Sequence, residues 1–260
     1  MIYKVVKTSL VGAIAVLTIL SNAKETQAQY RTPPPPPDAP ESARGGGDRS
    51  YCPALGSDVD ITPVIPVASG WGTTATASPT VWINLAYDDA TTQTLPPAEI
   101  YVLDRVSGDV VGEVEALELP EKAGTFGRLL PQLPTENTWY EWYVKLDCSP
   151  VDDPDNFSYL EVGGLIYYDK TLGDGAIVNA SDRQQQILFY EEKGVWYDLF
   201  SQLAMQQCEA EAESGEMASS SKLASLLTAG GLETIRAESV ICPMLSPASG
   251  SLTSSNFRPE

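Results

Sequence analysis

The chain has 260 residues, with 16 Lys and Arg against 35 Asp and Glu, and it contains no histidine. Its net charge of −19 excludes nucleic acids and anionic lipid surfaces as expected partners, because both are bound through Lys and Arg. The lack of histidine removes the usual base of a catalytic triad and the commonest zinc ligand.

The N-terminal segment has the features of a secretory signal peptide. Two lysines precede an apolar run over residues 10–20, and small residues follow it. This arrangement predicts cleavage after Ala23 or Ala28, and we favour a signal peptide of residues 1–28. The run is shorter than the roughly 20 residues of a membrane span, so no stable membrane insertion is expected after cleavage. Cleavage removes three lysines and one glutamate, which changes the net charge from −19 to −21.

A Pro- and Gly-rich linker is predicted over residues 29–49. Five prolines at 33–37 favour a polyproline II conformation, and three glycines at 45–47 favour a flexible backbone. We expect this segment to be a disordered spacer. Docking of the proline run in an aromatic groove is the alternative.

Residues 50–170 contain short β-prone runs separated by turns, which is the pattern of an antiparallel β-sandwich. An edge strand is expected over 62–67, because this run contains two prolines. The other strands are expected over 80–87, 99–105, 110–117, 124–130, 138–148 and 158–169. The predicted fold class is α+β, an Ig-like antiparallel sandwich followed by a small helical hairpin, with a β-barrel closed by helices as the alternative.

The strand over 138–148 has the clearest two-residue period. One face carries core residues, namely Tyr140, Trp142, Val144, Leu146 and Cys148. The opposite face carries Trp139 and Tyr143, and exposed aromatic rings on a sheet can stack on sugars, so these two are the candidate ligand-facing residues. The interpretation that we favour is that the helical hairpin covers them. In the last strand, Gly163 and Gly164 predict a bulge or a close backbone approach.

Residues 171–242 follow a period near 3.6 and are assigned to the helical subdomain. A capping box at residues 181–184 predicts a helix that ends before Gly194. A second helix is expected from Trp196 to about residue 213, a third from 219–221 to Gly230, and a short fourth over 232–239. Residues 243–260 are predicted to be a flexible tail.

All four cysteines lie in the part predicted to be exported, where thiols usually form disulfides. Three pairings are available to them. We favour Cys52 with Cys148, inside the β-rich part, and Cys208 with Cys242, inside the helical part.

The chain resembles the domain of unknown function 928 family, exported proteins of photosynthetic bacteria. The residues that carry the resemblance are Arg44 to Arg49 followed by Cys52, the strand start at Pro79 to Trp82, Tyr140, Trp142 and Cys148, Gly194 through Asp198, Leu232 and Glu233, and Ile241 with Cys242. Cys208 lies outside this pattern. The resemblance implies an architecture and an exported location, and it implies no reaction or ligand.

The sequence contains no recognised catalytic motif and implies no cofactor. Asp152, Asp153 and Asp155 are the weak metal candidates, because calcium binds carboxylate oxygens, but their spacing is not that of an EF-hand loop. We expect a solvated turn there, and we expect the acidity to serve solubility. The expected function is a non-catalytic interaction or structural module outside the cytoplasm, with a protein or glycan of the cell envelope as partner. The alternatives are a glycan-binding module that uses sheet aromatics and, less favoured, a carboxylate-based hydrolase.

Overall fold

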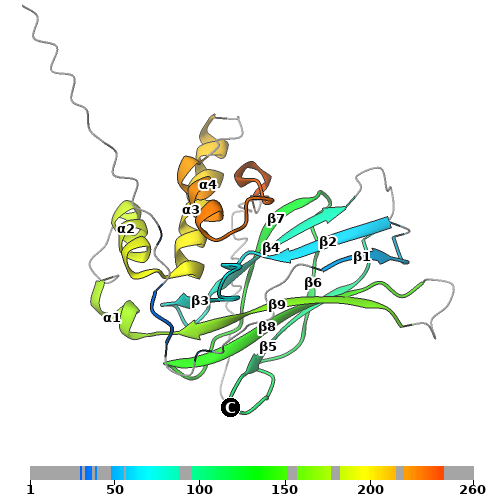
Figure 1. Cartoon of the computed structure of the whole chain (residues 1–260), viewed down its shortest axis with the longest axis horizontal. Helices are drawn as coiled ribbons and strands as arrows, with labels where there is room; N and C mark the ends of the chain where they lie inside the picture. Colours follow the sequence, from blue (N-terminus) through cyan, green and yellow to red (C-terminus); the bar gives the residue numbers. More distant parts are fainter. Residues whose placement is uncertain are drawn as a thin grey trace, which may run out of the picture.

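The computed structural model describes residues 30, 33–36, 39, 48–55, 57–87, 95–150, 157–176, 182–214 and 220–242. These residues form a mixed α+β fold with two mostly antiparallel sheets and a few helices (Figure 1). The helices gather at one end of the two sheets, as Figure 1 shows. The predicted signal peptide and the predicted C-terminal tail lie outside the described residues.

The first sheet has four strands, all paired antiparallel. In spatial order they are β1 (Asp48–Cys52), β2 (Ser57–Pro63), β4 (Thr80–Tyr87) and β7 (Gly124–Leu129). The predicted edge strand over 62–67 is wrong, because β2 lies inside the sheet and ends at Pro63. The chain then turns at Pro66, whose carbonyl accepts a hydrogen bond of 2.8 Å from the amide of Gly70.

The second sheet has five strands. In spatial order they are β3 (Trp71–Thr74), β9 (Tyr159–Tyr168), β8 (Thr138–Asp147), β5 (Ala98–Asp104) and β6 (Glu115–Leu117), with β3 and β9 parallel and the other pairs antiparallel. The strand expected over 110–117 is interrupted, because only a single bridge at Val110 precedes β6. Gly112 lies between them with φ of +76°, which breaks an extended strand.

The inward faces of both sheets share one hydrophobic core. The alternation predicted for β8 is confirmed, because all five expected core residues of residues 138–148 are fully buried. Trp142 is the largest of them, and it belongs to the same buried cluster as Ile61, Ile83 and Leu85 of the four-stranded sheet.

The helices are α1 (Thr171–Ala176), α2 (Arg183–Lys193), α3 (Trp196–Ser214), α4 (Ser221–Ala229) and a 3-10 turn, η1 (Ala237–Ser239). Asp182 caps α2, since its side chain accepts a hydrogen bond of 2.9 Å from the amide of Gln184, so the cap lies one residue after the predicted one. Gly194 ends the helix with φ of 68°, as predicted. The fourth helix expected over 232–239 is reduced to η1. Among the described residues, no helix is both long and apolar enough to cross a membrane.

The first turn of α3 is anchored in the interior by three consecutive side chains. Trp196 donates from Nε1 to the carbonyl of Val64 at 2.9 Å, and Tyr197 donates to the carbonyl of Leu165 at 3.0 Å. The Asp198 carboxyl accepts hydrogen bonds from the Thr74 hydroxyl at 2.8 Å and from the backbone amide of Ala75 at 3.0 Å. Burial raises the pKa of the Asp198 carboxyl, although these hydrogen bonds oppose the shift. The helical layer is therefore joined to β3, to β9 and to the residue that follows β2.

The described ends of the chain also pack on the fold. Tyr30, in the segment predicted to be a linker, contacts Trp196 edge to face at 5.1 Å between ring centroids and belongs to the core. Val240 forms a parallel bridge with Thr125 of β7, and the amide of Ile241 donates to the Thr125 carbonyl at 2.7 Å.

Candidate functional site

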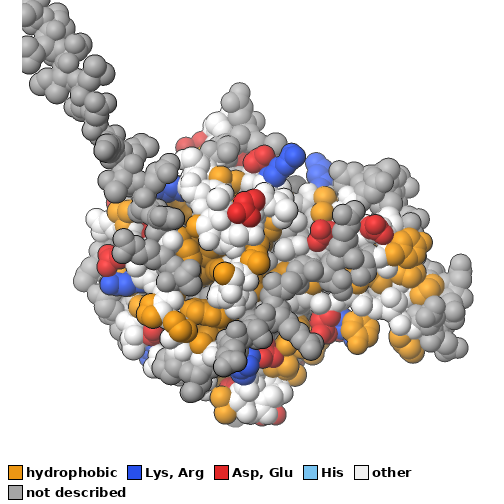
Figure 2. Space-filling view, in the orientation of Figure 1, with side chains coloured by type: hydrophobic (Ala, Val, Ile, Leu, Met, Phe, Trp, Pro, Cys, Tyr) orange, Lys and Arg blue, Asp and Glu red, His pale blue; other side chains and the backbone are white. Residues whose placement is uncertain are grey.

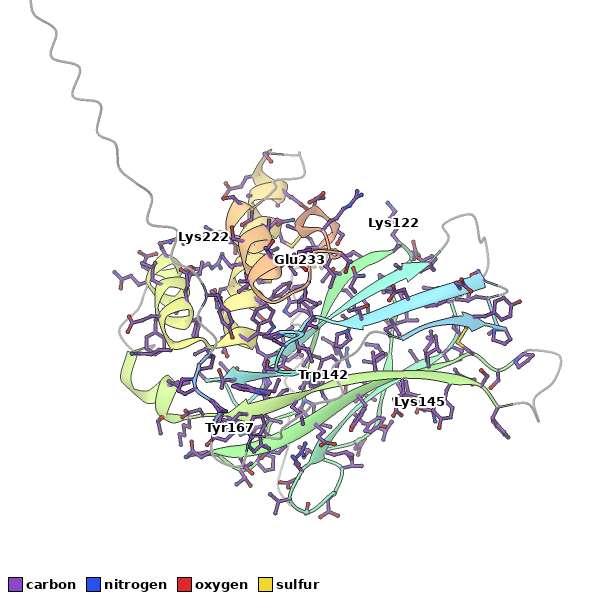
Figure 3. All side chains as sticks on the ribbon, in the orientation of Figure 1. Lys122, Trp142, Lys145, Tyr167, Lys222 and Glu233 are labelled. Carbon is purple, nitrogen blue, oxygen red and sulfur yellow. A yellow bond between two sulfur atoms is a disulfide. The ribbon has the colours of Figure 1, made fainter. Side chains whose placement is uncertain are left out.

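The outer face of the five-stranded sheet carries the candidate site. The register aligns outward positions of β5, β8 and β9, so that Tyr101 lies opposite Tyr143, and Lys145 lies opposite both Glu99 and Glu161. Figure 3 shows Trp142 between the sheets, with Lys145 and Tyr167 on the other side of β8 and β9. Of the helices, α3 packs mainly on β3 and β4.

One end of this face is apolar and covered. Trp71, Trp139, Leu165 and Tyr167 form a separate buried cluster, against which Ala39 packs. Trp139 is only 5% exposed and contacts Trp71 at 5.6 Å between ring centroids. The interpretation of Trp139 as a ligand-facing ring is therefore corrected, because neighbouring strands and Ala39 cover it. The helical hairpin, which was the expected cover, is not in this cluster.

The middle of the face is a connected set of tyrosines and carboxylates. The rings of Tyr101 and Tyr143 stack at 5.3 Å with an interplanar angle of 24°. Tyr101 donates to Glu161 at 3.0 Å, and Tyr143 donates to Glu141 at 2.8 Å. Arg105 forms an ion pair of 2.6 Å with the other oxygen of Glu141. These contacts hold both rings in fixed orientations.

The same contacts change the ionisation of the two phenols. Burial raises the pKa of Tyr143 to about 12, and the hydrogen bond to Glu141 acts in the same direction. Burial also raises the pKa of Tyr101, with a further contribution from the hydrogen bond to Glu161. Both hydroxyls therefore remain protonated donors at neutral pH.

Gly163 makes room for the tyrosine pair. It lies opposite Tyr143 on β9, where a Cβ would overlap the carbonyl oxygen of Trp142 and come within 2.9 Å of the Tyr143 ring. The pairing of β8 with β9 continues without interruption through Gly163 and Gly164. The predicted close backbone approach is thus confirmed at Gly163, and the bulge is not formed.

A pocket of about 250 Å³ opens at the other end of the face. Its lining combines charged, polar and aromatic side chains, namely Pro97, Glu99, Lys145, Asp147, Ser149, Phe157, Ser158 and Tyr159. Phe157 and Tyr159 are 82% and 58% exposed, and the Lys145 Nζ atom lies 4.5 Å from the centre of the Tyr159 ring. In Figure 2, hydrophobic side chains are visible at the end of the molecule where β1 and the start of β9 lie.

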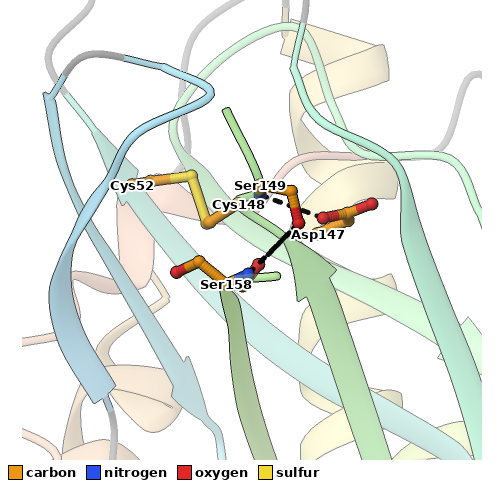
Figure 4. The surroundings of a disulfide bond; sticks show 5 residues. All are labelled: Cys52, Asp147, Cys148, Ser149 and Ser158. Carbon is orange, nitrogen blue, oxygen red and sulfur yellow. Dashed lines mark hydrogen bonds between the residues drawn. A yellow bond between two sulfur atoms is a disulfide. The ribbon is translucent and has the colours of Figure 1, made fainter. Parts of the chain in front are cut away.

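The wall of this pocket is fixed by hydrogen bonds and a disulfide (Figure 4). Asp147 accepts a hydrogen bond of 3.0 Å from the amide of Ser149, and the contacts with Ser149 lower the pKa of the Asp147 carboxyl. The Ser149 hydroxyl accepts a bond of 3.2 Å from the amide of Ser158. Cys148, between Asp147 and Ser149, is bonded to Cys52 of β1. The end of β8 is therefore tied to the first sheet and to β9.

Both disulfide pairings favoured from the sequence are present in the structure. Cys52 and Cys148 are 96 residues apart in sequence, and Cys208 and Cys242 are 34 apart. Cys208 is on α3, so the second bond fastens the segment after η1 to the longest helix.

The metal candidates Asp152, Asp153 and Asp155 lie outside the described residues. Within the part of the chain that the structure describes, no group of three or more His, Cys, Asp or Glu residues could hold a metal ion. The residues that the sequence analysis missed are Tyr101, Lys145, Phe157 and Tyr159. Tyr101 has the alternation of a strand residue, but its position opposite Tyr143 depends on the pairing of β5 with β8.

Comparison with known protein families gives a match over most of the chain. The family described as Domain of Unknown Function (DUF928) matches residues 44–240. This range runs from just before β1 to Val240, so it includes both sheets and all four α-helices. No curated protein matches the chain.

Proposed function

The chain belongs to the DUF928 family, and we propose that it is a non-catalytic binding module that acts outside the cytoplasm through the outer face of its five-stranded sheet. The partner is a protein or a glycan of the cell envelope. The observation that carries the proposal is the combination on one face of interlocked aromatic and charged side chains with an adjoining pocket. Rigid aromatic rings bind with little loss of conformational entropy, which suits a binding surface.

The two disulfides support the proposed location, since such bonds persist in oxidising compartments outside the cytoplasm. The signal-peptide pattern of residues 1–28 points the same way. Both observations support a partner in the envelope or beyond it.

The hydrogen bonds of Glu141 and Glu161 support a binding role for these two carboxylates over hydrolysis. Glu141 is engaged by Arg105 and Tyr143, and Glu161 is engaged by Tyr101. A carboxylate-based glycosidase instead needs an acid and a base or nucleophile that face a substrate from two sides. Glu141 and Glu161 therefore serve to orient rings.

We also propose that the two sheets form an Ig-like β-sandwich. The order β9-β8-β5-β6 corresponds to strands G, F, C and C′ of that fold, and β4 next to β7 corresponds to strands B and E. Tyr140, near the start of β8, donates to the carbonyl of Thr135 at 2.8 Å and accepts from its amide at 2.9 Å. Such a bond is the tyrosine corner that recurs at strand F of Ig-like domains.

The proposal is tested with two substitutions of equal charge change. Lys145→Glu alters the proposed surface, whereas Lys222→Glu alters the exposed side of α4. Each immobilised protein is incubated with envelope extract, and the retained proteins and polysaccharides are compared. We expect retention by the wild type and by Lys222→Glu and its loss in Lys145→Glu. Equal retention by both variants would place binding elsewhere on the molecule.

A further inference from the structure

The pocket at the end of the outer face has a composition that restricts its ligand. It contains one cation, Lys145, and two carboxylates, Glu99 and Asp147. An anionic ligand would approach both carboxylates, and a cationic ligand would approach the lysine, so each would meet like charge. An uncharged ligand with many hydroxyl groups meets neither penalty, since ammonium groups donate to hydroxyls and carboxylates accept from them.

The aromatic rim adds a second requirement. Phe157 is 82% exposed and Tyr159 is 58% exposed, although large apolar side chains gain by burial. The ammonium group of Lys145, at 4.5 Å from the ring centre, orients the Tyr159 ring and leaves more than half of this residue exposed. A ligand that covers these rings must have an apolar face as well as hydroxyl groups. A pyranose ring has both, because its axial C–H groups form one apolar face and its hydroxyls lie around the edge.

The size and the rigidity of the pocket complete the argument. Its volume of about 250 Å³ is below the roughly 300–1,000 Å³ of pockets that enclose drug-sized ligands, so it holds one or two small units of a longer molecule. The hydrogen bond from Ser149 to Asp147, and the disulfide between Cys148 and Cys52, fix the wall that carries the acceptor. The contacts with Ser149 lower the pKa of the Asp147 carboxyl and so further favour its ionised, accepting form.

We propose that this pocket binds an uncharged pyranose unit of a polysaccharide, with the Phe157 and Tyr159 rings against the sugar face and Lys145, Asp147 and Glu99 bonded to its hydroxyls. This rests on the proposed function and names the ligand class of the same face. The stacked pair of Tyr101 and Tyr143, whose hydroxyls are already bonded to glutamates, supports the neighbouring strands and is outside the sugar contact.

The test uses the disulfide-bonded protein and immobilised polysaccharides of known composition, namely neutral glucan, galactan and mannan, one sulfated glycan and one cationic amino-glycan. We expect saturable binding to at least one neutral polysaccharide and weaker binding to both charged ones. Tyr159→Ala is expected to weaken that binding at least tenfold, whereas Tyr159→Phe keeps the ring and keeps the binding. Leu188→Ala, which removes a 48% exposed apolar side chain on α2, is the control and should bind as the wild type does.

Three results would overturn the inference: no neutral polysaccharide is bound, a charged glycan is bound more tightly, or Tyr159→Ala binds normally. Because Tyr159 is exposed, the variant should melt at the wild-type temperature, and this measurement separates a lost contact from a lost fold. An envelope protein retained by the wild type and lost in Lys145→Glu, without any polysaccharide binding, would overturn the sugar assignment and leave the binding module in place. Equal retention of ligand by the wild type and by Lys145→Glu would place binding elsewhere on the molecule, and this result would overturn both proposals for the outer face.

Discussion

Trp142 of β8 donates a hydrogen bond of 3.0 Å from its indole Nε1 to the hydroxyl of Tyr197 on α3, in the fully buried interior between the sheets. The same hydroxyl donates to the carbonyl of Leu165 on β9. One phenol thus joins the helical layer to two strands of the five-stranded sheet, and it satisfies two polar groups that water does not reach.

Replacing Tyr197 with Phe tests this link. The substitution keeps the ring and leaves the Trp142 N–H and the Leu165 carbonyl without their partner, so we expect the free energy of unfolding to fall by about 1–3 kcal/mol. Chemical denaturation followed by tryptophan fluorescence measures the change. Tyr159→Phe, which removes an exposed hydroxyl, is the control and should change stability by less than about 0.5 kcal/mol. Equal effects of the two substitutions would contradict the role of the buried phenol.

The two disulfides should contribute unequally to stability. In the chain-entropy model, a loop of 96 residues corresponds to about 4.7 kcal/mol and a loop of 34 residues to about 3.8 kcal/mol. We therefore expect the Cys52→Ala, Cys148→Ala double variant to unfold at lower denaturant than the Cys208→Ala, Cys242→Ala variant. Equilibrium unfolding under non-reducing conditions measures the order, and the opposite order would count against loop entropy as the main cause.

Asp198 should make stability depend on pH. Its pKa is raised in the folded state by burial, so the folded state favours the protonated form. The stabilisation is present below the unfolded pKa of about 3.9 and is lost as pH rises through the folded value. Asp198→Asn keeps an acceptor for Thr74 and the Ala75 amide and does not titrate. The stability of the Asp198→Asn variant relative to the wild type should rise as pH increases from about 3.9 through the folded-state pKa of Asp198. Thermal melts at several pH values measure this difference. A difference that does not vary with pH would contradict the raised pKa.

Adding a methyl group at Gly163 should be more harmful than adding one at Gly164. The new Cβ of Gly163→Ala would overlap the backbone carbonyl of Trp142, which is held in the sheet. At Gly164 the nearest atom is the side-chain Cδ1 of Ile65, at 2.8 Å, and this atom can move. We expect a loss of about 1–3 kcal/mol or more for Gly163→Ala and a smaller loss for Gly164→Ala, measured by denaturant unfolding. A reversed order would show that the β8–β9 spacing can adjust.

Periodicity predicted most of the regular elements because local side-chain patterns determine them. The strands β4, β5, β7, β8 and β9 and the helices α2, α3 and α4 lie within a few residues of their predicted ranges. The site was not predictable in the same way. The pairing of β5, β8 and β9 brings Tyr101, Lys145 and Tyr159 together. Trp139 is buried against Trp71, which lies 68 positions earlier in the sequence. Such pairings depend on contacts between segments far apart in sequence, which a pattern within one segment does not contain.

The bridge between Val240 and Thr125 affects how this chain behaves before its cysteines are oxidised. β7 is a terminal strand of the four-stranded sheet, and a terminal strand with unpaired backbone groups is a template for adding a strand from another molecule. The segment that ends in Cys242 occupies part of that edge, and its bond to Cys208 keeps it there. In the reduced state, no disulfide holds this segment against β7. The tendency of the chain to self-associate should therefore be greatest before the Cys208–Cys242 bond forms.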